Sequence, residues 1–229
     1  MMTSFPEAEV AWRTRIADVY NSGDCEAAVR LADEFLREHP NAPLARYCVA
    51  VMRGDFSYDS RHSVEEASRL KQIAISGVRA LLEDPQFGEW PLPFQHRVRN
   101  EHYFFNEMSE EQYQLGLERI ALGEEGDYPA CVGASGMALR LLKAGDVEAA
   151  TSWARKSIQH FAEFEKKNPT WYNINHFGAQ SAACLGEFEI AERIFRAMFG
   201  KMKKPVDEKE LESFRRSCEE IKALRGDGG

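Results

Sequence analysis

The stretch between Trp171 and Glu187 holds the residue types that nucleophilic catalysis uses. Its sequence, WYNINHFGAQSAACLGE, contains one histidine, His176, and one cysteine, Cys184. A thiol beside an imidazole base is an activated nucleophile, but the two groups must lie within hydrogen-bonding distance. On one helix the eight positions between them span about 12 Å, at a rise of about 1.5 Å per residue. We therefore exclude this pair as a catalytic dyad.

Metal, phosphate and acid–base motifs are equally weak. The chain has no glycine-rich phosphate loop, no G-x-S-x-G nucleophile motif and no H-E-x-x-H metal motif. His96 and His102 lie six positions apart, which places them on different faces of a helix, and we interpret Glu101 and His102 as a surface pair. Paired carboxylates such as Glu65 and Glu66 occupy first helical turns, where they favour the positive end of the helix dipole. We expect no catalytic residue, no metal ligand and no cofactor.

The composition is that of an ordinary globular chain with an acidic balance. The 229 residues are 44% hydrophobic and 29% charged, and the formal net charge is −8. Binding to nucleic-acid phosphates needs clustered Lys and Arg, so we expect no nucleic-acid partner. No stretch approaches the ~18 apolar residues of a membrane span, and the N-terminus lacks the pattern of a signal peptide. Five scattered cysteines without a Cys-x-x-Cys pair favour reduced thiols and a cytoplasmic location.

Helical periodicity runs along the whole chain, and alternating strand patterns are nearly absent. Helix-start signals recur: a capping Ser or Asp with Glu or Gln three residues later stands at Ser4, Ser63, Ser109 and Asp207. Short connections predict that neighbouring helices pack as antiparallel hairpins. We predict about eleven helices, at residues 5–21, 24–39, 42–53, 63–84, 93–106, 109–123, 128–144, 146–167, 170–185, 187–200 and 207–225.

The connection from Asp84 to Phe94 is one of two long ones. Its sequence, DPQFGEWPLPF, contains three prolines and three aromatic residues. One interpretation is a stiff spacer that packs over a hairpin. The alternative is an exposed aromatic docking loop at residues 87–94, through which the chain would form a homo-oligomer.

A short motif occurs three times. It reads GDCEAA from Gly23, GDVEAA from Gly145 and GEFEIA from Gly186. The glycine ends one helix where a left-handed backbone is wanted. The acid that follows can cap the next helix, and the small alanine five positions after the glycine lets two helices approach closely.

This unit resembles the tetratricopeptide repeat, a helix–turn–helix motif of about 34 residues. The first copy matches best, with residues of the family's pattern at Trp12, Gly23, Ala28 and Pro40. The two later copies keep the turn glycine and the alanine but lack the early tryptophan, and their turn glycines lie 41 residues apart. The pattern therefore extends over three hairpins and is inferred for two more.

The resemblance implies an all-α fold with one domain over residues 1–225 and a disordered tail at 226–229. We expect a right-handed α-solenoid of about five antiparallel helical hairpins with a C-terminal capping helix. The last helix suits the end of such a stack, because one side is apolar and the remainder is charged. Its apolar stripe consists of Leu211, Phe214, Cys218, Ile221 and Leu224.

Members of this family bind peptides in a concave groove lined by the first helix of each hairpin. Alignment on the turn glycines assigns groove positions in two copies, and the helix at 93–106 carries a further polar stripe. The other interpretation is that all of these are ordinary solvated faces. The candidate groove residues are Asn173, His176 and Gln180, then Arg13 and Tyr20, and on the further stripe Arg99, His102 and Asn106.

The resemblance thus predicts a non-enzymatic, cytoplasmic module that binds a protein or peptide segment. Two alternatives stay open. One is a self-assembling homo-oligomeric scaffold, and the other is a small-molecule sensor or enzyme built on a helical scaffold.

Overall fold

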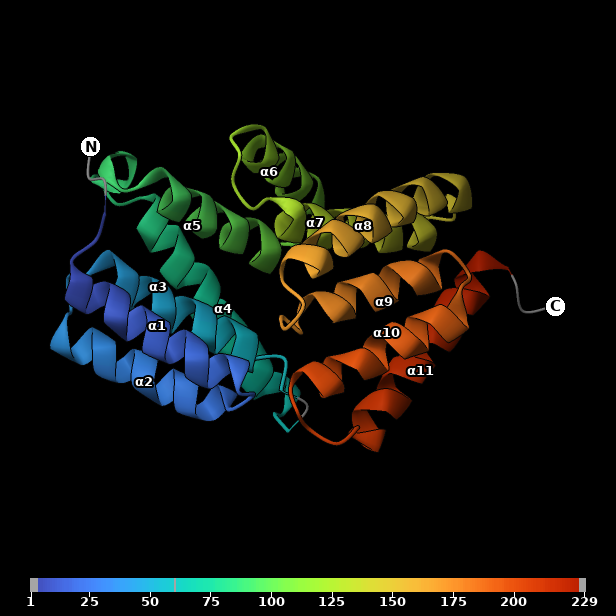
Figure 1. The fold of residues 1–229 in the computed structure, drawn as a ribbon, viewed down its shortest axis with the longest axis horizontal. Helices are drawn as coiled ribbons and strands as arrows, with labels where there is room; N and C mark the ends of the chain where they lie inside the picture. Colours follow the sequence, from blue (N-terminus) through green and yellow to red (C-terminus); the bar gives the residue numbers. More distant parts are fainter. Residues whose placement is uncertain (1–3, 60, 227–229) are drawn as a thin grey trace. The chain divides into compact units, whose positions relative to one another are not determined.

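The computed structural model describes residues 4–59 and 61–226 of the chain. Within these ranges the protein is all-α, with eleven α-helices, one short 3-10 helix and no strand (Figure 1). This confirms the predicted class, and each expected helix is present. The helices are α1 (Glu7–Asn21), α2 (Cys25–Glu38), α3 (Pro43–Phe56), α4 (Val64–Leu82), α5 (Leu92–Phe105), α6 (Ser109–Ala121), α7 (Asp127–Lys143), α8 (Val147–Lys167), α9 (Ile174–Cys184), α10 (Phe188–Lys201) and α11 (Glu208–Arg225); the 3-10 helix is η1 (Phe87–Glu89).

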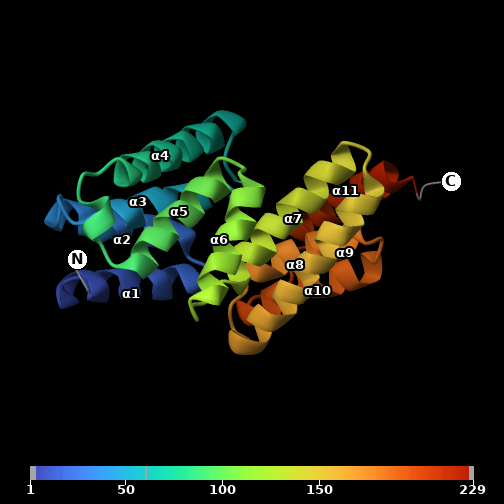
Figure 2. The same ribbon diagram turned by 90° about the horizontal axis from the view of Figure 1, so that it is seen from above.

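The helices form two compact units, residues 1–106 with α1 to α5 and residues 107–229 with α6 to α11. In unit 1 each helix packs against the next, and α3 also packs against α1 and α5. In unit 2 α7, α9 and α11 pack against one another, α6 packs against α7 (Figure 2), and α8 and α10 each pack against the helices that flank them in sequence. Within each unit the first helices of successive hairpins are therefore in contact. The expected single domain over residues 1–225 stays a prediction.

Two helix boundaries differ from the sequence prediction by more than two residues. α9 begins at Ile174 instead of residue 170, because the chain turns after Asn168, whose carbonyl accepts the Trp171 N–H at 3.0 Å. α3 continues past Gly54, where a loop was expected. This glycine is buried, and a Cβ added to it would lie 2.2 Å from the Phe105 ring. It permits close helix packing here and does not end the helix.

The three turn glycines adopt the left-handed backbone that the repeated motif predicts. Their φ angles are 84° at Gly23, 83° at Gly145 and 84° at Gly186. After α7 and α9, the turn also closes with a hydrogen bond from the residue following the glycine, as at Asp146, whose N–H donates to the Leu141 carbonyl at 3.0 Å. The motif's alanines are fully buried at the helix contacts: Ala28, Ala150 and Ala191.

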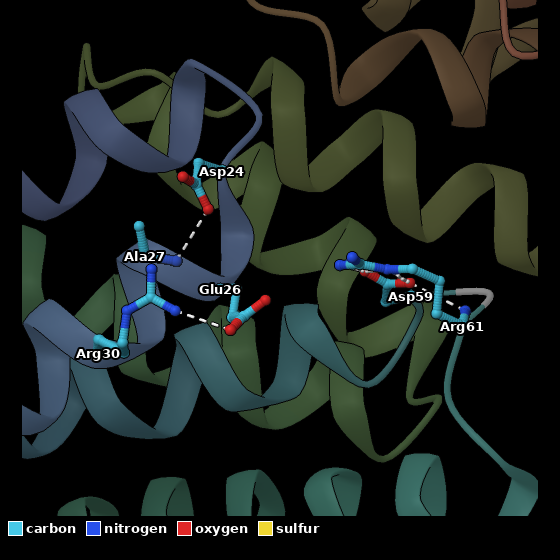
Figure 3. Close-up of polar contacts among 6 residues, drawn as sticks. All are labelled: Asp24, Glu26, Ala27, Arg30, Asp59 and Arg61. Atoms are coloured by element: carbon cyan, nitrogen blue, oxygen red, sulfur yellow. Dashed lines mark hydrogen bonds and ion pairs between the residues drawn. The ribbon is translucent and has the colours of Figure 1, made fainter.

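The capping role of the motif's acid holds in two copies of three. The Asp24 carboxylate accepts the Ala27 N–H at 2.9 Å (Figure 3), and the Asp146 carboxylate accepts the Ala149 N–H at 3.0 Å. The Glu187 side chain makes no such bond. The difference follows from side-chain length, because Asp places its oxygen beside the free amides and is preferred over Glu at this position.

Of the four helix caps predicted from Ser or Asp outside the repeated motif, two are observed. Ser63 and Asp207 cap α4 and α11 as predicted. Ser4 and Ser109 do not cap, and these two predictions are wrong. α1 begins only at Glu7, and Ser109 is itself the first residue of α6.

The aromatic side chains of the connection at residues 87–94 pack in the core of unit 1. Trp90 is 1% exposed and Phe94 is 4% exposed, and their ring centroids lie 5.5 Å apart. Phe87 packs edge-on against Trp90. The spacer interpretation is therefore confirmed, and the exposed docking loop is wrong for Trp90 and Phe94. Homo-oligomer formation itself stays a prediction.

The predicted apolar stripe of the last helix is buried over most of its length. Four of the five residues are buried, whereas Leu224 is 39% exposed. The helix ends at Gly226, with φ 79°; the rest of the predicted tail, 227–229, lies outside the described residues. No helix in the described ranges is both long enough and apolar enough to cross a membrane.

Candidate functional site

Six polar and ionisable side chains gather on α1, α3 and α5 of unit 1. Each of the three helices contributes two of them. On α1 and α3 the two residues lie about two turns apart, which places each pair on one helix face. We call this group the acid–tyrosine cluster; its members are Arg13, Tyr20, Tyr47, Asp55, Asn100 and Glu101.

Glu101 is held by neutral donors. The Tyr47 hydroxyl donates to its Oε1 at 3.4 Å, and the Asn100 amide donates to the same oxygen at 3.2 Å. Burial, together with the nearby charge of Asp55, raises the pKa of the Glu101 carboxyl to about 8. These hydrogen bonds act in the opposite direction, but they are weaker than the loss of hydration.

Asp55 is in a similar environment. Burial raises the pKa of its carboxyl to about 7, and a hydrogen bond from Tyr20 acts against the increase. Neither Asp55 nor Glu101 forms an ion pair within the described residues. Both keep part of their surface exposed. The two interacting carboxyl groups therefore titrate as a pair close to neutral pH.

Arg13 lies about two turns before Tyr20 on α1. Its charge acts on Tyr47 and on the neighbouring Cys48, where it partly offsets the effect of burial. Burial still dominates: the pKa of Tyr47 is raised well above its usual value, and that of Cys48 rises to about 12. Both groups are therefore uncharged at neutral pH, and Cys48 is not an activated nucleophile.

The predicted polar stripe on α5 contacts the aromatic connection and the end of its own helix. Arg99 lies 5.9 Å from the Phe87 ring, so it covers the aromatic connection. The Asn106 amide donates to the His102 carbonyl at 2.8 Å and lies 3.3 Å from that residue's Nδ1, which secures the end of the helix. Burial and the charge of Arg79 lower the pKa of His102.

The predicted residues on α9 lie in unit 2. The Gln180 amide donates to the Ser135 hydroxyl at 2.9 Å and ties α9 to α7. His176 is exposed. Asn173 precedes the helix without capping it. Cys184 is fully buried, and burial raises its pKa to about 11.

Sequence reasoning found Arg13 and Tyr20 but missed Asp55 and Glu101. The predicted helix at 42–53 ends before Asp55, and the sequence pattern indicates a surface position for Glu101. The available signal was the pair Tyr47 and Asp55, eight positions apart, which share a face only when the helix continues through the glycine. In the described ranges, no group of three His, Cys, Asp or Glu side chains is placed to hold a metal ion.

Comparison of the chain with protein-family models, with curated proteins and with solved structures finds no match in any of the three.

Proposed function

We propose that the chain is a non-enzymatic interaction module that holds a protein or peptide segment against the α1–α3–α5 face of unit 1. A cationic group of that segment sits at Asp55 and Glu101. The observation that carries this proposal is a pair of carboxyl groups on partly buried residues, each bonded by tyrosine and without an ion-pair partner among the described residues.

The charge of the pair favours a cation over other ligand groups. A carboxylate that has lost hydration without gaining a counter-ion is destabilised, and a lysine or arginine of the ligand supplies that counter-ion. Charge-assisted hydrogen bonds from ammonium or guanidinium groups are also stronger than those from neutral donors. The chain's net charge of −8 attracts a basic segment from a distance.

The tyrosines and Arg13 complete the face. The rings of Tyr20 and Tyr47 offer apolar and π surface to the stem of a lysine or arginine. Arg13, whose charge acts on Tyr47, suits an acidic group or a main-chain carbonyl of the same segment. This order of charges gives the ligand a direction along the helices.

The proposal includes the finer architecture, a tetratricopeptide-like α-solenoid. Support comes from the left-handed turn glycines, the buried alanines after them and the packing of successive first helices inside each unit. In such repeats the first helices line the binding face. α1, α3 and α5 occupy that position in unit 1.

The experiment uses two acetylated ten-residue peptides, one alternating Gly and Lys and the other alternating Gly and Glu, measured by isothermal titration at pH 7.5. We expect the wild type to bind the lysine peptide in preference to the glutamate peptide. Asp55→Asn/Glu101→Gln should weaken lysine-peptide binding at least tenfold.

The matched control is Glu38→Gln/Glu83→Gln, which removes two exposed carboxylates at helix C-termini and changes the net charge equally. It should bind almost as the wild type does. An equal loss in both double variants would show that only the overall charge matters, and the proposed site would then be wrong.

A further inference from the structure

We infer that Asp55 and Glu101 form a proton-operated latch on the α1–α3–α5 face: with protons bound they let the three helices pack together, and after ionisation they repel each other and attract a cation. The inference concerns the regulation of the proposed ligand face and in that sense rests on the proposed function. Its physical basis lies in unit 1 alone.

The latch connects three helices through two tyrosines. Tyr20 on α1 bonds to Asp55 on α3, and Tyr47 on α3 bonds to Glu101 on α5. The two carboxyl groups are close enough for the charge of Asp55 to act on Glu101. Ionisation of both groups therefore places repulsion in the middle of a layer that the hydroxyl groups hold together.

Among the described residues, no ion pair joins Asp55 or Glu101 to a basic side chain of the packed helices, Arg97 and Arg99 of α5 included. On α1, Arg13 acts on Tyr47 and Cys48. The arginines on α3 and α4 are engaged elsewhere. On α3, Arg53 pairs with Asp33 of α2 at 2.8 Å and Arg46 pairs with Asp84 at 2.6 Å. On α4, Arg69 pairs with Glu66 at 2.8 Å and Arg79 acts on His102 of α5. Asn100, beside Glu101, donates without charge.

The direction of the pH effect follows from these surroundings. Burial raises the carboxyl pKa values to about 7 and about 8, above those of an unfolded chain. The folded state therefore binds protons that the unfolded state has already released. Stability is fully present below the unfolded pKa values and is lost as the pH rises through the folded ones.

Cation binding uses the same equilibrium. The O–H bond of a carboxyl group breaks, its proton passes to the buffer, and the carboxylate that remains receives the ammonium of the ligand, which keeps its own protons. No other co-reactant takes part. A higher pH therefore ionises the two carboxyl groups, which favours binding of a cation. In the absence of a ligand, the same ionisation weakens the packing of α1, α3 and α5.

The test needs no ligand. Carbon-13 NMR of the carboxyl groups in the full wild-type chain, assigned through the Asp55→Asn and Glu101→Gln variants, follows each ionisation directly. We expect at least one of the two groups to titrate with a midpoint above pH 6. Midpoints below pH 5 for both groups would overturn the inference.

Urea unfolding at pH 5.5 and pH 8 gives an independent readout. The wild-type urea midpoint should fall more between these pH values than that of Asp55→Asn/Glu101→Gln, while Glu38→Gln/Glu83→Gln should follow the wild type. An equal fall in all three proteins would overturn the latch. A failure of peptide binding contradicts the proposed function and leaves these ligand-free results unaffected.

Discussion

The Tyr47 hydroxyl on α3 donates a hydrogen bond to the Glu101 carboxylate on α5 at 3.4 Å. The distance is long for such a bond, so the contact is weak on its own. The contact matters because of where it lies. It connects two helices through a carboxyl group that has no counter-ion in the described residues. The same arrangement joins Tyr20 and Asp55 across α1 and α3.

Removal of this hydroxyl tests its role. In Tyr47→Phe the pKa of Glu101 should rise further, because the hydrogen bond now lowers it. The free energy of unfolding should fall by about 1 kcal/mol. Carboxyl NMR and urea unfolding measure the two effects. Tyr103→Phe, at a half-buried tyrosine of the same helix, is the control and should leave Glu101 unchanged. A pKa of Glu101 that stays constant in Tyr47→Phe contradicts the contact.

The repeated turn makes a second prediction through its caps. Asp24→Ala and Asp146→Ala each remove a side-chain acceptor from a helix amide and should lower the free energy of unfolding by about 1 kcal/mol. Glu187→Ala, at the corresponding position of the third copy, should have little effect because no cap bond exists there. Equal losses at all three positions would be incompatible with the observed caps.

Glycine conformation gives a third prediction. A Cβ at Gly145 or at Gly200 would meet no atom within 4 Å, but only Gly145 has a positive φ. Gly145→Ala should therefore destabilise the fold by about 1 kcal/mol. Gly200→Ala, inside α10, should stabilise it by up to about 1 kcal/mol. Thermal unfolding of the two variants decides this, and the same sign for both would exclude the conformational explanation.

Two of the predicted groove residues on α9, Gln180 and His176, should differ in their effect on stability. Gln180→Ala removes the bond to Ser135 between α9 and α7 and should lower the free energy of unfolding by about 1 kcal/mol. His176→Ala changes an exposed side chain and should remain within about 0.5 kcal/mol of the wild type. Urea unfolding compares them, and an unaltered midpoint for Gln180→Ala would remove its structural role.

Local patterns explain why the helices were predictable and the site largely was not. Periodicity, caps and turn glycines act within a few residues, so the sequence alone indicated every helix and the left-handed turns at Gly23, Gly145 and Gly186. Asp55 and Glu101 interact across two helices, and no spacing in the sequence encodes that proximity. The burial of Trp90 likewise depends on packing against other helices.

Errors in prediction have the same origin. The predicted helix at 42–53 ends before Gly54, yet α3 continues to Phe56, and the close approach of the Phe105 ring leaves room only for a glycine there. The polar residues Arg99 and Asn106 were considered for a ligand face, yet they contact the neighbouring segment and the end of their own helix. Polar character alone does not distinguish a binding face from a packing contact.

The most direct measurement is a titration of wild-type chain with the lysine peptide, followed by carbon-13 NMR of all side-chain carboxyl groups at pH 7.5. The proposed function predicts that the signals of Asp55 and Glu101 move first and furthest, and that those of the exposed Glu38 and Glu83 move little. Equal shifts at all four groups, or no shift at Asp55 and Glu101, would contradict a cation-binding face on α1, α3 and α5.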